Sequence, residues 1–225
     1  MGVGYSFLVN NAYKSVRVFG FILKYGKLRP LNANNRISHS RLLSLPTLRN
    51  ALAALMLGVV AGVIALVAER ADLFMTGGNL QLLGYINTYT WILVSVLLFG
   101  FWGAIITTEI QAMIGLITMT NPALSWLWPF VNLIFAVSVG LVAVGFSKLR
   151  SNAKISTKLL LLSSVCALLD IPLVYFVMVT VLSLPVVVYL AALPVYIILQ
   201  LVPSTFLAYW IVRALKRSKA LNLGE

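Results

Sequence analysis

The sequence predicts an all-α protein, a polytopic six-helix transmembrane bundle preceded by a basic amphipathic helix. Apolar residues make up 61% of the 225 residues and charged residues only 10%, whereas soluble domains are about half apolar and a quarter charged. Several apolar runs approach the roughly 20 residues that cross a bilayer as a helix. The net charge of +12 comes from Lys and Arg that flank these runs, as topology determinants do. We therefore expect the lipid bilayer, and no nucleic acid, as a partner.

Three parts follow from this pattern: a basic segment over residues 1–50 at the cytoplasmic membrane surface, the transmembrane domain over 51–217 and a cytoplasmic tail over 218–225. Between residues 5 and 23, apolar side chains recur at steps of three and four, with basic residues largely on the other side. Such a helix lies on the cytoplasmic leaflet or packs on a partner subunit, and both interpretations stay open. Residues 28–50 are expected to form a linker.

The first span is expected over residues 51–68, where Glu69 and Arg70 end it. One face of this span consists of small residues that let another helix approach closely. These are Gly58, Ala61, Gly62 and Ala65. Residues 71–88 are expected to form a long connection rich in Gly, Asn and Gln. A connection of that length is often a lid or a binding loop.

Residues 90–119 are mostly apolar and are long enough for one tilted span or two short ones. Two crossings, with a turn near residues 103–108, bring every basic cluster to the cytoplasmic side, whereas one crossing does not. We therefore expect two short crossings. Glu109 then faces protein or water, because a carboxylate next to lipid at this depth is costly.

Three further spans are expected over residues 127–146, 158–182 and 184–212. Asp170 lies at mid-depth of the fifth span, and three prolines in the sixth span predict kinks or local unwinding. Six spans place both termini in the cytoplasm. We expect the protein in the plasma membrane.

The usual signatures of catalysis and metal binding are missing from this sequence. There is no GxxxxGK[ST] or GxGxxG motif for nucleotides. The one Cys, at position 166, and the one His, at position 39, make no cluster of metal ligands. We therefore expect no enzyme, no metal and no cofactor, and we interpret Cys166 as a buried structural thiol.

A small-molecule binding site needs only aromatic walls and a few convergent polar groups. The stretch from Phe99 to Asn132 concentrates such residues in an apolar region, and an ionisable group inside the membrane is a functional-site hypothesis by default. Our binding candidates come from the loop after the first span and from the later spans. They are Asn79, Gln81, Asn87, Glu109, Trp128, Asn132, Asp170, Tyr175 and Gln200. For Glu109 and Asp170, a purely structural role stays open.

Two runs in the middle of the chain read GAIITTEIQAMIGL and NPALSWLWPFVNLIFAVSVGLVA. These two runs resemble a known family when they are taken together with four other features of the sequence. The four features are the six expected spans, the small-residue face of the first span, the long loop after it and the close-set second and third helices. The region from Ala51 to Arg217 is similar to the substrate-binding membrane subunit, or S-component, of energy-coupling factor (ECF) type vitamin transporters.

The resemblance implies a subunit that holds a vitamin or related micronutrient near the outer face, beneath the loop after the first span. It also implies that the small-residue face docks onto a transmembrane coupling subunit driven by two separate ATPase subunits. The alternative is a non-catalytic structural or accessory subunit of a larger membrane complex, in which the polar residues only fix helix packing.

Overall fold

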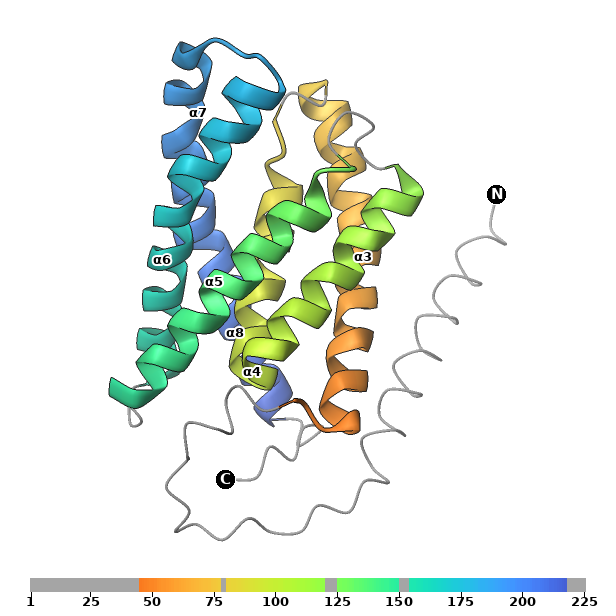
Figure 1. Cartoon of the computed structure of the whole chain (residues 1–225), viewed down its shortest axis with the longest axis vertical. Coiled ribbons are helices and arrows are strands. Elements are labelled where there is room, and N and C mark those ends of the chain that lie inside the picture. The colour runs from red at the N-terminus through yellow and green to blue at the C-terminus, as the bar shows by residue number, and fades with distance from the viewer. Residues whose placement is uncertain (1–44, 78–79, 120–124, 150–153, 218–225) are drawn as a thin grey trace, which may run out of the picture. The chain divides into compact units, whose positions relative to one another are not determined.

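The computed structural model describes residues 45–77, 80–119, 125–149 and 154–217, and over these it is helical with no strand (Figure 1). The elements in chain order are α3 (Leu48–Thr76), α4 (Leu83–Thr118), α5 (Trp128–Leu149), α6 (Ile155–Tyr175), the π-helical η1 (Phe176–Val181), α7 (Val186–Leu199), the π-helical η2 (Gln200–Ser204) and α8 (Thr205–Arg217). The expected amphipathic helix before residue 45 and the tail after residue 217 lie outside the described residues.

Five helical segments are long and apolar enough to cross a membrane, which confirms the prediction of a helical multi-pass membrane protein. They are α3, α4, α5, α6 continued by η1, and α7 continued through η2 into α8. Large apolar side chains on the outside of these helices are exposed, for example Phe74 at 93%, Ile117 at 80% and Val187 at 73%. An outer surface of this kind suits lipid and would cost free energy in water.

Helix α3 continues beyond Glu69 and Arg70 to Thr76, so the end that we predicted for the first span is wrong. The long connection that we expected over residues 71–88 is also wrong, because α4 already begins at Leu83. The reason is a tertiary contact of Asp72, which is 1% exposed. Its Oδ1 accepts a hydrogen bond from the N–H of Leu83 at 2.9 Å, and its Oδ2 accepts one from the N–H of Gly84 at 2.8 Å. A carboxylate on α3 thus supplies the N-terminal partners that α4 needs.

Helix α4 reverses its direction at Gly100. The side-chain amide of Gln111 donates a hydrogen bond to Thr88 Oγ1 at 2.8 Å across 23 residues, whereas a straight helix would separate these residues by about 35 Å. Gly100 has φ 73° and ψ −156°, a conformation that is essentially restricted to glycine. In Figure 1, α4 descends in yellow to its label and returns in yellow-green. The turn that we predicted near residues 103–108 therefore lies at residue 100.

The small-residue face of α3 packs on α4 within the same chain. A Cβ atom added at Gly58 would lie 2.7 Å from the carbonyl oxygen of Thr107, and one added at Gly62 would lie 2.5 Å from Ile114 Cδ1. Ala61 and Ala65 are buried as well. The close helix approach that these small residues predicted is therefore present. However, α4 covers the face that we expected to dock a partner subunit.

The three prolines of the last span act in three different ways. Pro185 precedes α7 as its N-cap, Pro194 lies inside α7, and Pro203 lies inside η2. Pro203 has no N–H to donate to the carbonyl four residues earlier, Leu199 O. The hydroxyl of Ser204 donates a hydrogen bond to this carbonyl at 3.0 Å. The local unwinding that we predicted is thus present as the π-helical turn, with a neighbouring hydroxyl satisfying the backbone.

Candidate functional site

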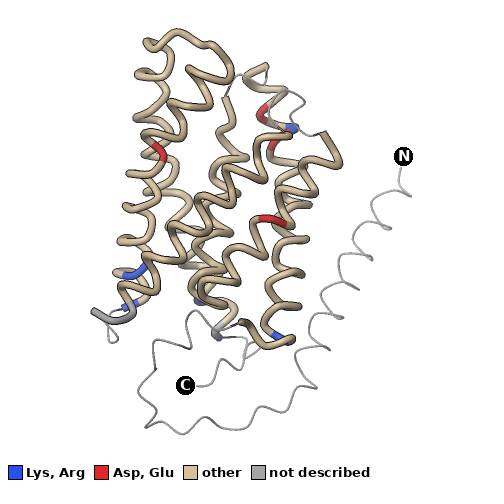
Figure 2. Tube along the Cα trace, in the orientation of Figure 1, with Lys and Arg blue, Asp and Glu red and all other residues tan. Residues whose placement is uncertain are grey.

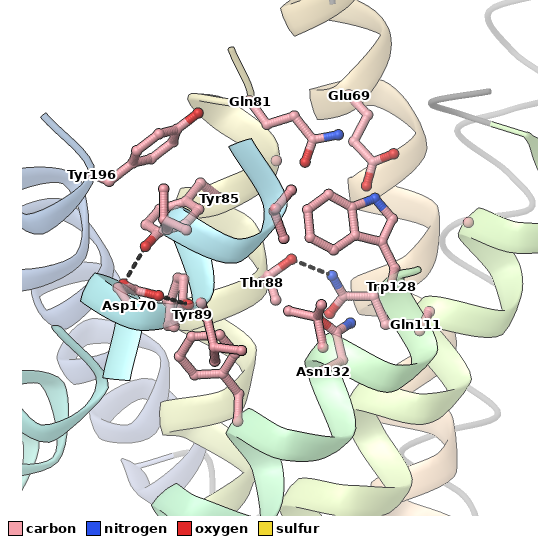
Figure 3. Close-up of a pocket in the computed structure, with 18 of the residues that line it drawn as sticks. Glu69, Gln81, Tyr85, Thr88, Tyr89, Gln111, Trp128, Asn132, Asp170 and Tyr196 are labelled. Carbon is pink, nitrogen blue, oxygen red and sulfur yellow. Dashed lines mark hydrogen bonds between the residues drawn. The ribbon is translucent and has the colours of Figure 1, made fainter. Parts of the chain in front are cut away.

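A cavity of about 90 Å³ lies between the two halves of α4, α5, α6 with η1, and α7 (Figure 3). Glu69 of α3 and Gln81, from the short connection before α4, also line it. By this volume the cavity has room for several waters or a small organic molecule. The reversal of α4 creates the space, because Tyr85 and Thr88 on one half face Gln111 on the other.

One side of the cavity consists of a carboxylate surrounded by aromatic rings. Asp170 is fully buried, and the hydroxyls of Tyr85 and Tyr89 donate hydrogen bonds to its Oδ2 and Oδ1 respectively. The two tyrosines are four residues apart, so they lie on the same face of α4. Their ring centroids are 4.5 Å apart, and the Tyr196 ring lies 4.7 Å from that of Tyr85. Phe135 packs edge-on against Tyr89 at 5.2 Å.

The other side of the cavity consists of amides and an indole. Gln111 is 4% exposed; its Nε2 is bonded to Thr88, but its Oε1 has no hydrogen-bond partner within the described residues. Gln81 Nε2 and Trp128 Nε1 are likewise buried without a partner in the described part of the chain. Figure 3 shows these side chains on the same side of the void, with Asn132 below them. A buried polar atom without a partner costs about 1–3 kcal/mol, so three of them around one cavity indicate a site for water or a ligand.

The cavity brings together four of the candidates that we predicted, namely Gln81, Trp128, Asn132 and Asp170. Asn87, Glu109, Tyr175 and Gln200 do not line this cavity, and Asn79 lies outside the described residues.

The candidates outside the cavity have other surroundings. Asn87 Nδ2 donates to the carbonyl of Ala61, and its Oδ1 accepts from the indole N–H of Trp91, so it joins α3 to α4. Tyr175 is 43% exposed and contacts the Tyr189 ring edge-on. Gln200 is fully buried in η2, and neither its Oε1 nor its Nε2 has a hydrogen-bond partner in the described part of the structure.

Several residues that line the cavity were not among our predicted binding residues. They are Glu69, Tyr85, Thr88, Gln111 and Tyr196. The signal for Tyr85 and Thr88 was present, because Thr88 and Tyr89 follow Tyr85 at steps of three and four residues, as one face of a helix requires. Assigning residues 71–88 to a loop concealed this spacing.

The described lining residues offer two carboxylates, amides, phenols and an indole, which are groups that bind by charge and hydrogen bonds. Among the described residues there is no group of three or more His, Cys, Asp or Glu that could hold a metal ion. The arrangement is suited to holding a small polar molecule.

Comparisons of the chain with models of protein families, with curated proteins and with solved structures found no match. We therefore infer the function from the cavity and the topology.

Proposed function

We propose that this protein is a membrane-embedded binding subunit that holds a small molecule in the cavity, as part of a micronutrient uptake transporter energised by separate ATPase subunits. One observation supports this proposal above the others: three buried polar atoms without partners in the described part of the chain meet at one cavity, from α4, from α5 and from the connection before α4. Helix packing alone does not call for them, because a buried polar atom without a partner lowers stability.

The proposal includes six crossings with both termini in the cytoplasm. Each half of α4 has about 17 residues, which corresponds to roughly 26 Å of helix, slightly less than the ~30 Å hydrocarbon core. Arg49, Lys154 and Lys158 are in or next to the first turns of α3 and α6. Figure 2 shows Lys and Arg at this end of the helices, whereas Arg70 is near the other end of α3. By the positive-inside rule, the cavity then lies in the outer half of the plasma membrane, where a ligand arrives.

The transporter would still need a coupling subunit to reach its ATPases. Because α4 covers Gly58, Ala61, Gly62 and Ala65, such a subunit would dock on another surface of the bundle. The binding proposal does not depend on which surface that is.

A matched pair of glutamine variants tests the proposal. Gln111 and Gln200 are both buried with unpartnered amide atoms, but only Gln111 lines the cavity. Thermal unfolding in nanodiscs against a micronutrient panel should identify a ligand that stabilises the wild type, by about 2.7 kcal/mol at one hundred times its Kd. Gln200→Met should keep this shift. Gln111→Met should lose most of it while remaining within about 1 kcal/mol of the unliganded wild type, since losing the Thr88 hydrogen bond is offset by removing an unpartnered oxygen.

Affinity purification of the tagged chain provides the second measurement. A binding subunit of this transporter class should recover a membrane coupling protein and ATPase subunits. If no compound shifts the wild type and the recovered membrane partners lack ATPases, the accessory-subunit alternative replaces our proposal.

A further inference from the structure

The charged side chains among the described residues that line the cavity are all acidic. Glu69 and Asp170 both line it, and the sequence contains no Lys, Arg or His in residues 71–147 or 159–212. The nearest basic residue in sequence, Arg70, is exposed and is not among the lining residues. An anionic ligand would therefore face two acidic groups, and no basic residue is among the described residues that line the cavity, so its binding costs free energy.

The aromatic groups around the cavity favour a positive charge and a flat shape. Trp128, Tyr85, Tyr89 and Tyr196 all line the space, and the face of an aromatic ring attracts a cation within about 6 Å. The hydroxyls of Tyr85 and Tyr89 already donate to Asp170. Donation to a carboxylate polarises a hydroxyl, so these oxygens become better acceptors for an N–H of the ligand.

The unpartnered atoms specify the ligand's hydrogen-bonding groups. Gln111 Oε1 is an acceptor and needs an N–H or O–H, whereas Trp128 Nε1 and Gln81 Nε2 are donors and need an acceptor. A ligand that satisfies all three atoms carries both kinds of group.

From these observations, and building on the proposed function, we infer that the ligand is a small planar organic cation with both donor and acceptor groups, such as a protonated nitrogen heterocycle. Its positive charge lies among the tyrosines near Asp170. Its hydrogen-bonding edge faces Gln111, Trp128 and Gln81.

Three probes of nearly equal shape and different charge test this inference. At pH 7, benzamidine is a cation, benzamide is neutral and benzoate is an anion. Titrations of the full chain in nanodiscs, followed by ligand-observed NMR and thermal unfolding, should show benzamidine binding at least about tenfold more tightly than benzamide. Benzoate should cause no shift.

Variants that each remove one negative charge then show which acidic residue causes the preference for benzamidine over benzamide. Glu69→Gln and Asp170→Asn should each reduce the ratio of benzamidine to benzamide affinity by at least about threefold. Glu109→Gln is the matched control, because Glu109 is an acid on α4 that does not line the cavity, and it should leave the ratio unchanged. If Asp170→Asn fails to fold, Glu69→Gln still tests the role of charge.

The outcomes separate this inference from the proposed function. The cation inference is overturned if benzamide or benzoate binds as tightly as benzamidine or more tightly, or if benzamidine does not bind. In that case, a micronutrient whose stabilising effect depends on Gln111 would still support the proposed binding subunit. An unchanged affinity ratio in both Glu69→Gln and Asp170→Asn overturns the inference as well. If neither the probes nor the micronutrient panel shift the wild type, both proposals fail.

Discussion

At the residue scale, Asp170 is a fully buried carboxylate inside a membrane-spanning helix, which is costly unless it has partners. Two tyrosine hydroxyls donate to it, one to each oxygen. Removing one partner from a buried charged group leaves part of its desolvation cost uncompensated. The Tyr85, Tyr89 and Asp170 cluster therefore stabilises the contact between α4 and α6 and also forms one wall of the cavity.

We predict that Tyr89→Phe lowers the free energy of unfolding by about 1–3 kcal/mol, because the ring remains while the bond to Asp170 Oδ1 is lost. The measurement is unfolding in mixed micelles with increasing SDS. Tyr175→Phe is the matched control, since Tyr175 is 43% exposed, and it should change the free energy by less than about 0.5 kcal/mol. Equal effects of the two variants would show that the bond to Asp170 contributes no stability.

At the element scale, the reversal of α4 depends on a single backbone conformation. Gly100 has a positive φ, and a Cβ atom added there would meet no other atom within 4 Å. Space therefore does not require glycine at this position. The backbone conformation does, because φ 73° with ψ −156° strains a residue that has a Cβ.

We predict that Gly100→Ala destabilises the bundle by about 1–3 kcal/mol. Gly145 offers the control: it lies in α5, has open space around an added Cβ and does not have a positive φ. Gly145→Ala should be neutral or stabilising by up to about 1 kcal/mol, because Ala favours a helix over Gly. Thermal unfolding of the two variants side by side tests this difference. Equal effects would mean that the strain at Gly100 is relieved elsewhere.

The packing of α3 on α4 is a second feature at this scale. Gly58 and Gly62 allow the second half of α4 to approach α3 so closely that any Cβ would clash. On the first half of α4, the side-chain amide of Asn87 donates to Ala61 O. The first N–H groups of α4 donate to the carboxylate of Asp72. Both halves of α4 are thus held by one helix, which fixes the hairpin.

At the scale of the whole molecule, the six-crossing proposal requires the reversal of α4 to place both of its ends on one side of the membrane. We predict that cysteines introduced at Leu80 and Met119, in a Cys166→Ala background, react with a membrane-impermeant maleimide added outside intact cells. A cysteine in place of Lys154, at the opposite end of the helices, should react only after permeabilisation. Labelling of Leu80→Cys and Met119→Cys from opposite sides would show that α4 crosses once, and the six-crossing proposal would be wrong.

The class of the protein and most of its helices follow from the sequence alone. The prediction for the fourth span, residues 127–146, is close to α5 at Trp128–Leu149, and Asp170 lies within a span as expected. Four of the nine predicted binding residues line the cavity. Predictions of this kind succeed because transfer into lipid depends on the composition and length of one segment, which are local properties.

The tertiary structure decided which helices meet. The sequence places Asp72 in the connection after the first span, whereas in the structure the first N–H groups of α4 donate to its carboxylate. The small residues of α3 are compatible with any neighbouring helix, and the structure shows that this helix is α4. Asp170 is 85 residues from Tyr85 and 81 residues from Tyr89 along the chain, yet the three residues form one hydrogen-bonded group. Whether a polar side chain in a membrane supports the fold or faces a cavity depends on its partners from other helices, and no local pattern in the sequence specifies those partners.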